Sequence, residues 1–313
     1  MVRFATEKDI PFLKQAWKVC FDDPDAFIDW NFSKNFSPCD TLIAEAEGVP
    51  ASNLQLMPHR IALRGREYPI NYVSGVATLP EFRHRGLVRE LFAFAFPEMQ
   101  RRGQPISLLV PFNYEFYQKF GYCQCYEKVF RFANLLPEGE YITTISPNLI
   151  ADLDRIYRRE MAERTGYALR THADWQKILE DLLLLSQGLV WCSSDGYALI
   201  TPRKEGGFEA HETLGSCPLV FQEERKPFAM ARIVDVMRLL EDLAPEFNRP
   251  VRLRIRDEQI LKNNVTVSIA NGTATLCQDF DREMDIKELT AELFGFGSCT
   301  MLDLQNPYLN MIF

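Results

Sequence analysis

The most basic part of this otherwise acidic chain combines three arginines with a glycine. Arg83, Arg85 and Arg89 surround Gly86, and the flanking residues predict a strand before this group and a helix that begins at Leu87. The first N–H groups of a helix have no partner within the helix, and the helix dipole favours an anion at that end. The group therefore predicts a phosphate or pyrophosphate site, with a solvated basic turn as the alternative. Its spacing is neither that of a GxGxxG dinucleotide motif nor that of a P-loop.

The elements around this basic loop alternate in type. Residues 70–78 predict a strand covered on both faces, residues 87–101 a helix, and residues 106–110 a further strand. A strand, a loop, a helix and a strand in succession form a βαβ-like unit. A short aromatic helix is expected over residues 114–120, and Gly121 ends it.

Two parts of this region resemble known acetyltransferases. Residues 76–87, VATLPEFRHRGL, resemble the acetyl-CoA motif of the GNAT N-acetyltransferases, Arg/Gln-x-x-Gly-x-Gly/Ala, through Arg83 and Gly86, and Val88 follows where that motif has Gly or Ala. Residues 103–112 and 116–122 look like the Eis (enhanced intracellular survival) acetyltransferases. Residues 230–240 and the Asn-Gly hairpin near residue 271 look like the sterol-carrier-protein-like domain of that family.

The resemblance implies a fold class and three domains. The fold would be mixed α+β and α/β. Residues 1–135 would form a GNAT acetyl-CoA-binding domain, a mixed twisted sheet with flanking helices. Residues 136–224 would form a second, reduced and degenerate GNAT-like domain. Residues 225–313 would form a sterol-carrier-protein-like α/β domain that delivers the C-terminal carboxylate. Breaks in the sequence near Leu136 and Phe228 agree with these limits.

The resemblance also implies two catalytic groups. Tyr117, which stands three positions before Phe-Gly-Tyr, would protonate the departing CoA thiolate, since a phenol of pKa ~10 carries its proton at neutral pH. The C-terminal carboxylate of Phe313 would accept the proton of the substrate amine. The chain ends in the apolar segment YLNMIF, and burial of such an end would raise the pKa of its carboxylate. Packing of an aromatic ring and of an apolar tail are the alternatives.

By the same resemblance, acetyl-CoA is the cosubstrate and no metal takes part. Backbone N–H groups near residues 76–78 would polarise the thioester carbonyl, and amides from His84 to Arg89 would hold the phosphates. The expected cofactor contacts lie at the strand end, in the loop, in the first helical turn and before the aromatic helix: Val76, Ala77, Thr78, Arg83, His84, Arg85, Gly86, Leu87, Val88, Arg89 and Asn113.

An acidic and aromatic segment offers a candidate substrate pocket. Asp25, Asp29 and Trp30 are expected to form one wall of a pocket for a cationic amine. The substrate would be a small molecule of polyamine or aminoglycoside type, or a lysine side chain. A solvated helix start is the alternative.

Composition excludes several classes of protein. The chain has 313 residues, with 43 Asp and Glu against 35 Lys and Arg, and the net charge of −8 argues against a nucleic-acid binder. No apolar run approaches the ~18 residues of a membrane span. The eight cysteines are scattered and no secretory signal precedes them, which favours reduced thiols and a cytoplasmic protein.

The expected function is an acetyl-CoA-dependent N-acetyltransferase that acts on an amine. The resemblance further implies a homo-oligomer, either a trimer or a hexamer. The alternative function is that of a non-catalytic CoA- or lipid-binding protein that retains the fold.

Overall fold

A computed structural model describes residues 1–296, 301–302 and 307–309. Contacts divide the chain into two compact units. Unit 1 comprises Met1–Tyr126 and Phe228–Pro307, and unit 2 comprises Glu127–Pro227 and Tyr308–Phe313. In the part of the chain that the structure describes, no helix is both long and apolar enough to cross a membrane.

The large sheet of unit 1 is mixed, in the order β1-β2-β3-β4-β5-β13-β6. Its strands are β1 (Val2–Phe4), β2 (Thr41–Ala46), β3 (Val49–Leu63), β4 (Arg66–Thr78), β5 (Ile106–Leu109), β13 (Met230–Ile233) and β6 (Cys123–Gln124). β4 is parallel to β5, while β13 is antiparallel to both of its neighbours. The strand at residues 230–233 thus lies in the same sheet as the N-terminal residues, although more than a hundred residues separate it from β5.

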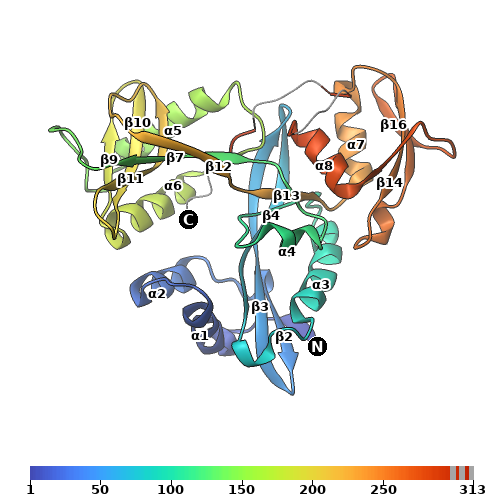
Figure 1. The fold of residues 1–313 in the computed structure, drawn as a ribbon, viewed down its shortest axis with the longest axis horizontal. Helices are drawn as coiled ribbons and strands as arrows, with labels where there is room; N and C mark the ends of the chain where they lie inside the picture. Colours follow the sequence, from blue (N-terminus) through green and yellow to red (C-terminus); the bar gives the residue numbers. More distant parts are fainter. Residues whose placement is uncertain (297–300, 303–306, 310–313) are drawn as a thin grey trace. The chain divides into compact units, whose positions relative to one another are not determined.

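The helices of this part are α1 (Ile10–Cys20), α2 (Asp25–Lys34), α3 (Leu87–Arg101) and α4 (Tyr114–Gln118). Figure 1 shows α3 beside the long strands β3 and β4. Apolar residues recur on one face of α3, and Phe92 and Phe96 are buried completely against the sheet. Burial of a phenylalanine of this kind stabilises the fold by about 1.5–3 kcal/mol. Pro97 is accommodated on the exposed face, where its ring meets solvent.

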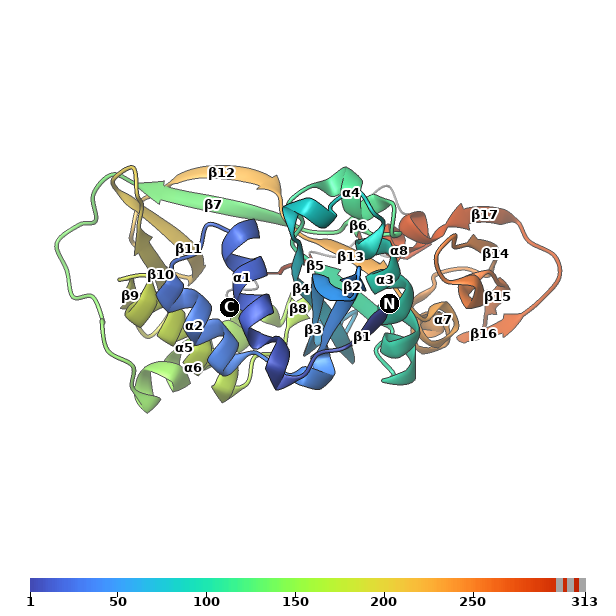
Figure 2. The same ribbon diagram turned by 90° about the horizontal axis from the view of Figure 1, so that it is seen from below.

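The rest of unit 1 contains a small sheet in the order β16-β15-β14-β17. Figure 2 shows this sheet with its two helices in orange and red. The expected hairpin at Asn271-Gly272 is confirmed: both residues have positive φ, 52° and 74°, as a tight hairpin turn requires. The elements are α7 (Val236–Leu243), β14 (Val251–Arg256), β15 (Thr266–Ala270), β16 (Thr273–Leu276), β17 (Arg282–Asp285) and α8 (Ile286–Phe294).

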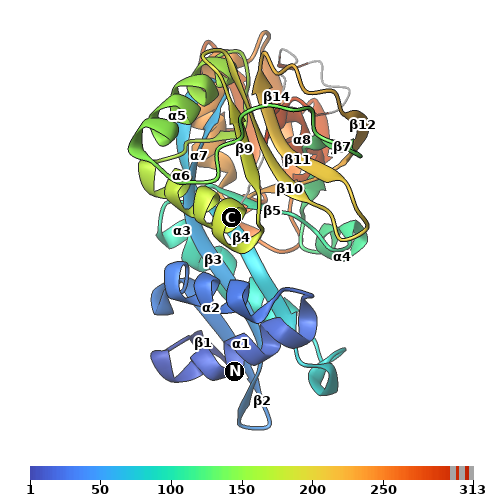
Figure 3. The ribbon, with the colours of Figure 1, turned by 90° about the vertical axis from the view of Figure 1, so that its left-hand side faces the viewer.

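Unit 2 is an antiparallel sheet in the order β12-β7-β11-β10-β9. Its helices cover one face, where Tyr197 and Leu199 of β10 meet Trp175, and the view in Figure 3 shows both helices on that side. The elements are β7 (Glu127–Ala133), α5 (Pro147–Met161), β8 (Tyr167–Ala168), α6 (His172–Leu179) with a π-helical turn at Glu180–Leu185, β9 (Leu189–Cys192), β10 (Gly196–Pro202), β11 (Phe208–Gly215) and β12 (Gln222–Pro227).

Candidate functional site

β4 and β5 form a fork in the large sheet. Their parallel pairing covers Ile70, Asn71 and Tyr72 of β4, but β4 continues to Thr78. On its other edge, β4 stays paired with β3 up to Thr78. The N–H and C=O groups of residues 73–78 that face the fork therefore lie beyond the pairing with β5, so they are suited to bind an extended ligand.

A bulge at Gly75 shapes this part of β4. The register with β3 shifts between Asn53 and Gln55, and Gly75 has a φ of +56°. The Asn53 side chain donates a hydrogen bond of 2.6 Å to the Gly75 carbonyl. A β-carbon at Gly75 would lie 2.9 Å from the Trp17 ring and 3.2 Å from Oε1 of Gln55, so only glycine fits here. The bulge is thus fixed by the hydrogen bond from Asn53 and by the close approach of Trp17 and Gln55.

The three strand residues expected to contact the cofactor alternate across the sheet. Ala77 is buried in the core, while Val76 and Thr78 are only partly covered and share the other face. The Ser52 hydroxyl lies 2.8 Å from both the Ala77 carbonyl and the Thr78 hydroxyl, which ties the end of β4 to β3.

The basic loop follows directly and ends in the first turn of α3. His84 has a φ of +63° and Gly86, the residue that caps α3, has a φ of +79°. Left-handed residues within such a loop turn successive N–H groups toward a common concavity that favours anions. A histidine in this conformation is uncommon, and such residues cluster at functional sites. The start of α3 follows directly, and the N-terminus of a helix favours an anion.

The arginine side chains of the loop are partly engaged by the protein itself. Arg85 pairs with Glu47 and lies over the Phe82 ring at 5.1 Å, and Arg83 donates to the Thr78 carbonyl at 3.2 Å. His84 and Arg89 are exposed. An anion bound at this loop would therefore depend on the backbone for fixed donors, with the arginines as surrounding positive charge.

Tyr117 lies on α4 in an aromatic cluster. Asn113 caps this helix by accepting a hydrogen bond of 2.9 Å from the Phe116 N–H, so Asn113 has a defined structural role. The Tyr117 side chain is 4% exposed, and the rings of Phe92, Phe112, Phe116 and Tyr122 surround it edge to face. Burial, with a smaller contribution from the nearby phenols of Tyr122 and Tyr72, raises the pKa of Tyr117 well above its usual value.

Tyr72 is a residue of this site that the sequence did not indicate. It is the last residue of β4 that pairs with β5, so it stands at the vertex of the fork. Burial raises the pKa of its phenol to about 12. It acts electrostatically on Tyr117, although 45 residues separate the two in the sequence. No local motif links these tyrosines, so only the fold could reveal the pair.

The residues proposed for the substrate pocket are found on α2. Asp25 and Asp29 are 72% and 70% exposed and pair with Lys18 and Lys14 of α1 at 2.7 and 2.6 Å. The Trp30 ring lies 5.8 Å from that of Phe27. Exposed pairs of this kind contribute little stability, so the carboxylates can exchange a lysine for a cationic ligand. Their role in amine binding stays a prediction.

Phe313 lies outside the described residues, but the segment before it is anchored within unit 2. Tyr308 donates a hydrogen bond of 2.8 Å to the Glu212 carboxylate and, through its N–H, one of 2.9 Å to the Thr165 carbonyl. Arg170 forms two bonds of 2.7 and 2.9 Å with the same carboxylate, and Tyr197 donates a further one of 2.7 Å. The side chains of Arg170 and Glu212 are completely buried.

Neither a metal site nor a disulfide is found in the described part of the chain. No group of three His, Cys, Asp or Glu side chains there is placed to hold a metal ion. The seven cysteines within it carry free thiols.

Comparison with known proteins identifies the N-terminal domain. Residues 1–125 match the family model described as an acetyltransferase (GNAT) domain. Among curated proteins, none matches this chain in sequence. The N-terminal residues thus match a GNAT acetyltransferase domain, and the protein is an acyltransferase.

Several solved structures share the fold over the whole chain. A probable N-acyltransferase from Enterococcus faecalis superposes with a TM-score of 0.82 at 17% identity, covering 100% of this chain and 99% of that one. A GCN5-related N-acetyltransferase from Anabaena variabilis gives 0.78 at 18% identity, and Eis1 from Mycobacterium abscessus gives 0.78 at 16%, each covering 100% of both chains. At such identities the likeness establishes the fold.

Proposed function

We propose that this acyltransferase moves an acetyl group directly from acetyl-CoA to an amine, with Tyr117 as general acid and the main-chain carboxylate of Phe313 as general base. The observation that carries the proposal is the placement of Tyr117. Its phenol is buried within electrostatic reach of Tyr72 at the fork of β4 and β5, and its raised pKa keeps the proton in place. A protonated phenol beside a thioester is suited to protonate a departing thiolate.

The cofactor would lie along the open edge of β4 and end at the start of α3. Its pantetheine arm would pair with the backbone of residues 76–78. Its pyrophosphate would bind the N–H groups of residues 84–89, with Arg83, Arg85 and Arg89 as surrounding positive charge. The fork, the bulge at Gly75 and the two left-handed residues of the loop support this placement. Asn113 would contact the cofactor from the start of α4.

The reaction then proceeds without a covalent enzyme intermediate. The neutral form of the substrate amine attacks the thioester carbonyl carbon, and the carboxylate of Phe313 takes the proton that the nitrogen loses as it becomes an amide. Backbone N–H groups of residues 76–78 stabilise the oxyanion that forms. The C–S bond breaks, the Tyr117 phenol gives its proton to the thiolate, and the products are the N-acetylated amine and CoA with a free thiol. Proton exchange with solvent returns both groups to their starting states.

The anchored tail supports the role of Phe313. Tyr308 is held by two hydrogen bonds only five residues before the chain end. Each rotatable residue between an anchor and a reacting group adds conformational entropy, so a short tether favours a reproducible position. In this proposal, the base at Phe313 would act on a short tether from the anchored Tyr308.

The substrate we propose is a cationic small-molecule amine or a lysine side chain, with Asp25, Asp29 and Trp30 as one wall of its pocket. The overall acidity of the chain supports a cationic substrate. The architecture would be Eis-like, with a second degenerate GNAT-like domain, a sterol-carrier-protein-like domain and assembly into a homo-oligomer. The free thiols are consistent with a reducing, cytoplasmic location.

An extension of the chain end tests the assignment of Phe313. One glycine added after Phe313 moves the carboxylate away from its site but keeps every side chain. We expect turnover to fall by about 10²-fold or more, as for loss of a general base, with acetyl-CoA binding retained in calorimetry. A glycine added before Met1 is the matched control. Equal turnover of the two extended chains would remove Phe313 from the mechanism.

A further inference from the structure

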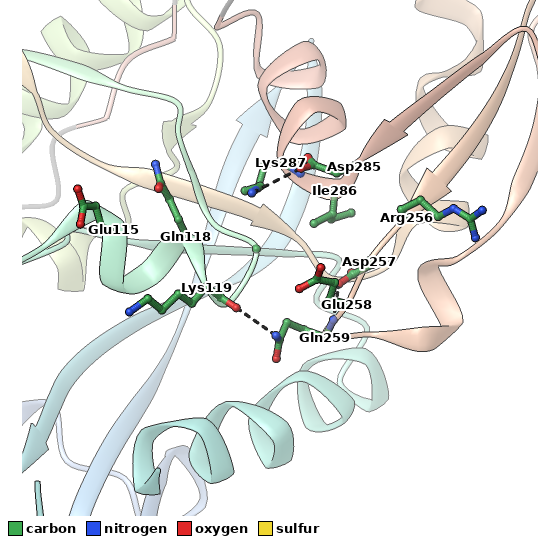
Figure 4. A pocket seen from close by; sticks show the side chains of 11 residues that line it. Glu115, Gln118, Lys119, Arg256, Asp257, Glu258, Gln259, Asp285, Ile286 and Lys287 are labelled. Carbon is green, nitrogen blue, oxygen red and sulfur yellow. Dashed lines mark hydrogen bonds and ion pairs between the residues drawn. The ribbon is translucent and has the colours of Figure 1, made fainter. Parts of the chain in front are cut away.

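Two side chains from the C-terminal part of unit 1 hold the turn that follows Tyr117. Arg232 of β13 donates to the carbonyl of Phe120, and Gln259 donates to the carbonyl of Lys119 at 3.0 Å. The first donor is 0% exposed, whereas Gln259 is exposed and lines a surface cavity that Figure 4 displays together with Lys119. Two successive carbonyls of one turn are thus bound by residues more than a hundred positions later in the chain.

Arg232 is itself held in place by a buried carboxylate. Its guanidinium forms two hydrogen bonds, of 2.8 and 2.7 Å, with the two oxygens of Asp257. The N–H groups of Gln259 and Ile260 and the side chain of Asn263 also donate to Asp257, at 2.9, 3.1 and 2.9 Å. Both of these bonds come from Nη2, while Nη1 donates to the Phe120 carbonyl, so the two nitrogens together fix the plane of the guanidinium as well as its position. The loop at residues 257–263 therefore sets where Arg232 points.

Gly121 shows how closely the guanidinium approaches the turn. A β-carbon at this position would coincide with Nη1 of Arg232, and the glycine has a φ of +79°. Both facts restrict the position to glycine. The same turn joins Tyr117 to the core, because the Phe120 and Tyr122 N–H groups donate to the Tyr117 carbonyl at 2.9 and 3.4 Å.

From these contacts we infer that Arg232, oriented by Asp257, is a positioning residue that sets the orientation of Tyr117 for proton transfer. The inference rests on the proposed function, because it assumes that Tyr117 is the general acid. Arg232 lies over the Phe96 ring at 4.4 Å, and the Phe92 ring of the same helix stacks on Phe120 at 4.4 Å and meets Tyr117 edge to face. Arg232 thereby holds the turn at the Phe120 carbonyl, and Phe92 holds it at the Phe120 ring.

Arg232→Lys is the variant that tests this role. An ammonium keeps the positive charge beside Asp257 but cannot span both the carboxylate and the Phe120 carbonyl. We expect kcat to fall about ten- to a hundredfold, since small displacements of a reacting group cost this much, and the KM for acetyl-CoA to stay within about twofold. Arg64→Lys is the matched control, because Arg64 is also buried in unit 1 and donates to the carbonyls of Glu292 and Leu293, away from the turn.

Combination with Tyr117→Phe separates positioning from general damage. If Arg232 acts through the phenol, Arg232→Lys costs less than about twofold in kcat once the phenol is absent. The inference is overturned if Arg232→Lys has the kcat of the wild type. It is also overturned if Arg232→Lys lowers kcat as much in the Tyr117→Phe background as in the wild type. Either result leaves the assignment of Tyr117 as the acid unchanged. Wild-type kcat in Tyr117→Phe alone overturns the assignment of the acid and the inference with it.

A milder variant covers the case in which Arg232→Lys does not fold. Gln259→Met removes the exposed amide that binds the Lys119 carbonyl but keeps the length of the side chain. We expect a two- to tenfold fall in kcat, roughly the worth of one hydrogen bond, and no fall in the Tyr117→Phe background. If Gln259→Met folds normally and its kcat is unchanged, the inference that contacts to this turn position Tyr117 is contradicted.

Discussion

The phenol of Tyr117 combines two properties that a general acid needs. Aromatic rings enclose it and keep water away, which holds the proton on the oxygen. Its pKa is also raised by the phenol of Tyr72, and Tyr72 stands at the vertex of the fork, where an extended cofactor bound along β4 would place its thioester. The same aromatic surroundings therefore suit both roles considered for Tyr117, packing in the core and general acid catalysis.

The pKa of Tyr117 gives a prediction for the pH profile. Burial raises this pKa above the usual 10.0, so the phenol keeps its proton at higher pH than an exposed tyrosine. We expect no loss of kcat from its ionisation between pH 6 and about pH 10, as measured with saturating substrates. An alkaline limb below pH 10 that disappears in Tyr117→Phe would contradict this expectation.

Single residues could be proposed for the site from the sequence where neighbours in the sequence carry the signal. Arg83 to Gly86 form one short motif, and Tyr117 stands at a fixed distance before Phe-Gly-Tyr. Tyr72 and Arg232 were not predictable, because their contacts join distant parts of the chain. Arg232 meets the Phe120 carbonyl across 112 residues, a separation that no local pattern encodes.

At the scale of elements, the end of β4 and the start of α3 act as one unit of the site. Residues 79–86 connect them, and the φ of +79° at Gly86 is a conformation that residues with a β-carbon adopt at a cost of about 1–2 kcal/mol. This cost is relieved when the loop leaves the left-handed region, which would turn the N–H groups away from the position proposed for the phosphates.

Gly86→Ala should therefore weaken acetyl-CoA binding. We expect the Kd to rise about five- to thirtyfold, which corresponds to the strain of one left-handed residue. Isothermal calorimetry measures it. Gly65→Ala is the matched control, since Gly65 has a φ of +71°, is equally open around its missing β-carbon and lies in the turn between β3 and β4. An equal change in both variants would show that the loop at Gly86 does not bind the phosphates.

Elements were predictable where apolar residues recur with a clear period. The helix over residues 87–101 matches α3 to the residue, and the strand over 106–110 differs from β5 by one residue. β12 was not predicted, because all of its residues are exposed and it has no apolar alternation. Its partner β7 is partly covered on both faces and carries an equally weak signal.

At the scale of the whole molecule, the stability of unit 2 includes a contribution from the buried ion pair of Arg170 and Glu212. Burial disfavours the ionised Glu212, but Arg170 and the hydroxyls of Tyr197 and Tyr308 outweigh it and hold the pKa of Glu212 below its usual 4.5. Since the folded pKa is depressed, the ionised carboxylate contributes stability above pH 4.5, and this contribution is lost as the pH falls.

Glu212→Gln should destabilise unit 2 by about 3–5 kcal/mol at pH 7, because Arg170 would remain as a buried and unpaired charge. Chemical denaturation of both proteins measures the difference, which should shrink as the pH is lowered below 4.5. Acetyl-CoA binding should persist, since the residues proposed for it lie in unit 1. A difference that does not depend on pH would contradict the role of the ionised carboxylate.

The arrangement of the whole chain was less predictable than its parts. The GNAT domain at the N-terminus could be recognised from one motif, but the insertion of β13 between β5 and β6 could not. β13 contains only Met230–Ile233, and its place depends on pairing with strands from the first half of the chain. Such long-range pairing is set by tertiary contacts rather than by local propensity.

The central claim is direct acetyl transfer to an amine with Tyr117 as the acid. The measurement that tests it most directly is thiol release from acetyl-CoA in the presence of a panel of cationic amines, with the wild type and Tyr117→Phe compared. We predict turnover by the wild type and a loss of about 10²-fold or more in the variant, with acetyl-CoA affinity unchanged. Equal turnover by the two proteins, or none by the wild type while acetyl-CoA binds, would contradict the claim.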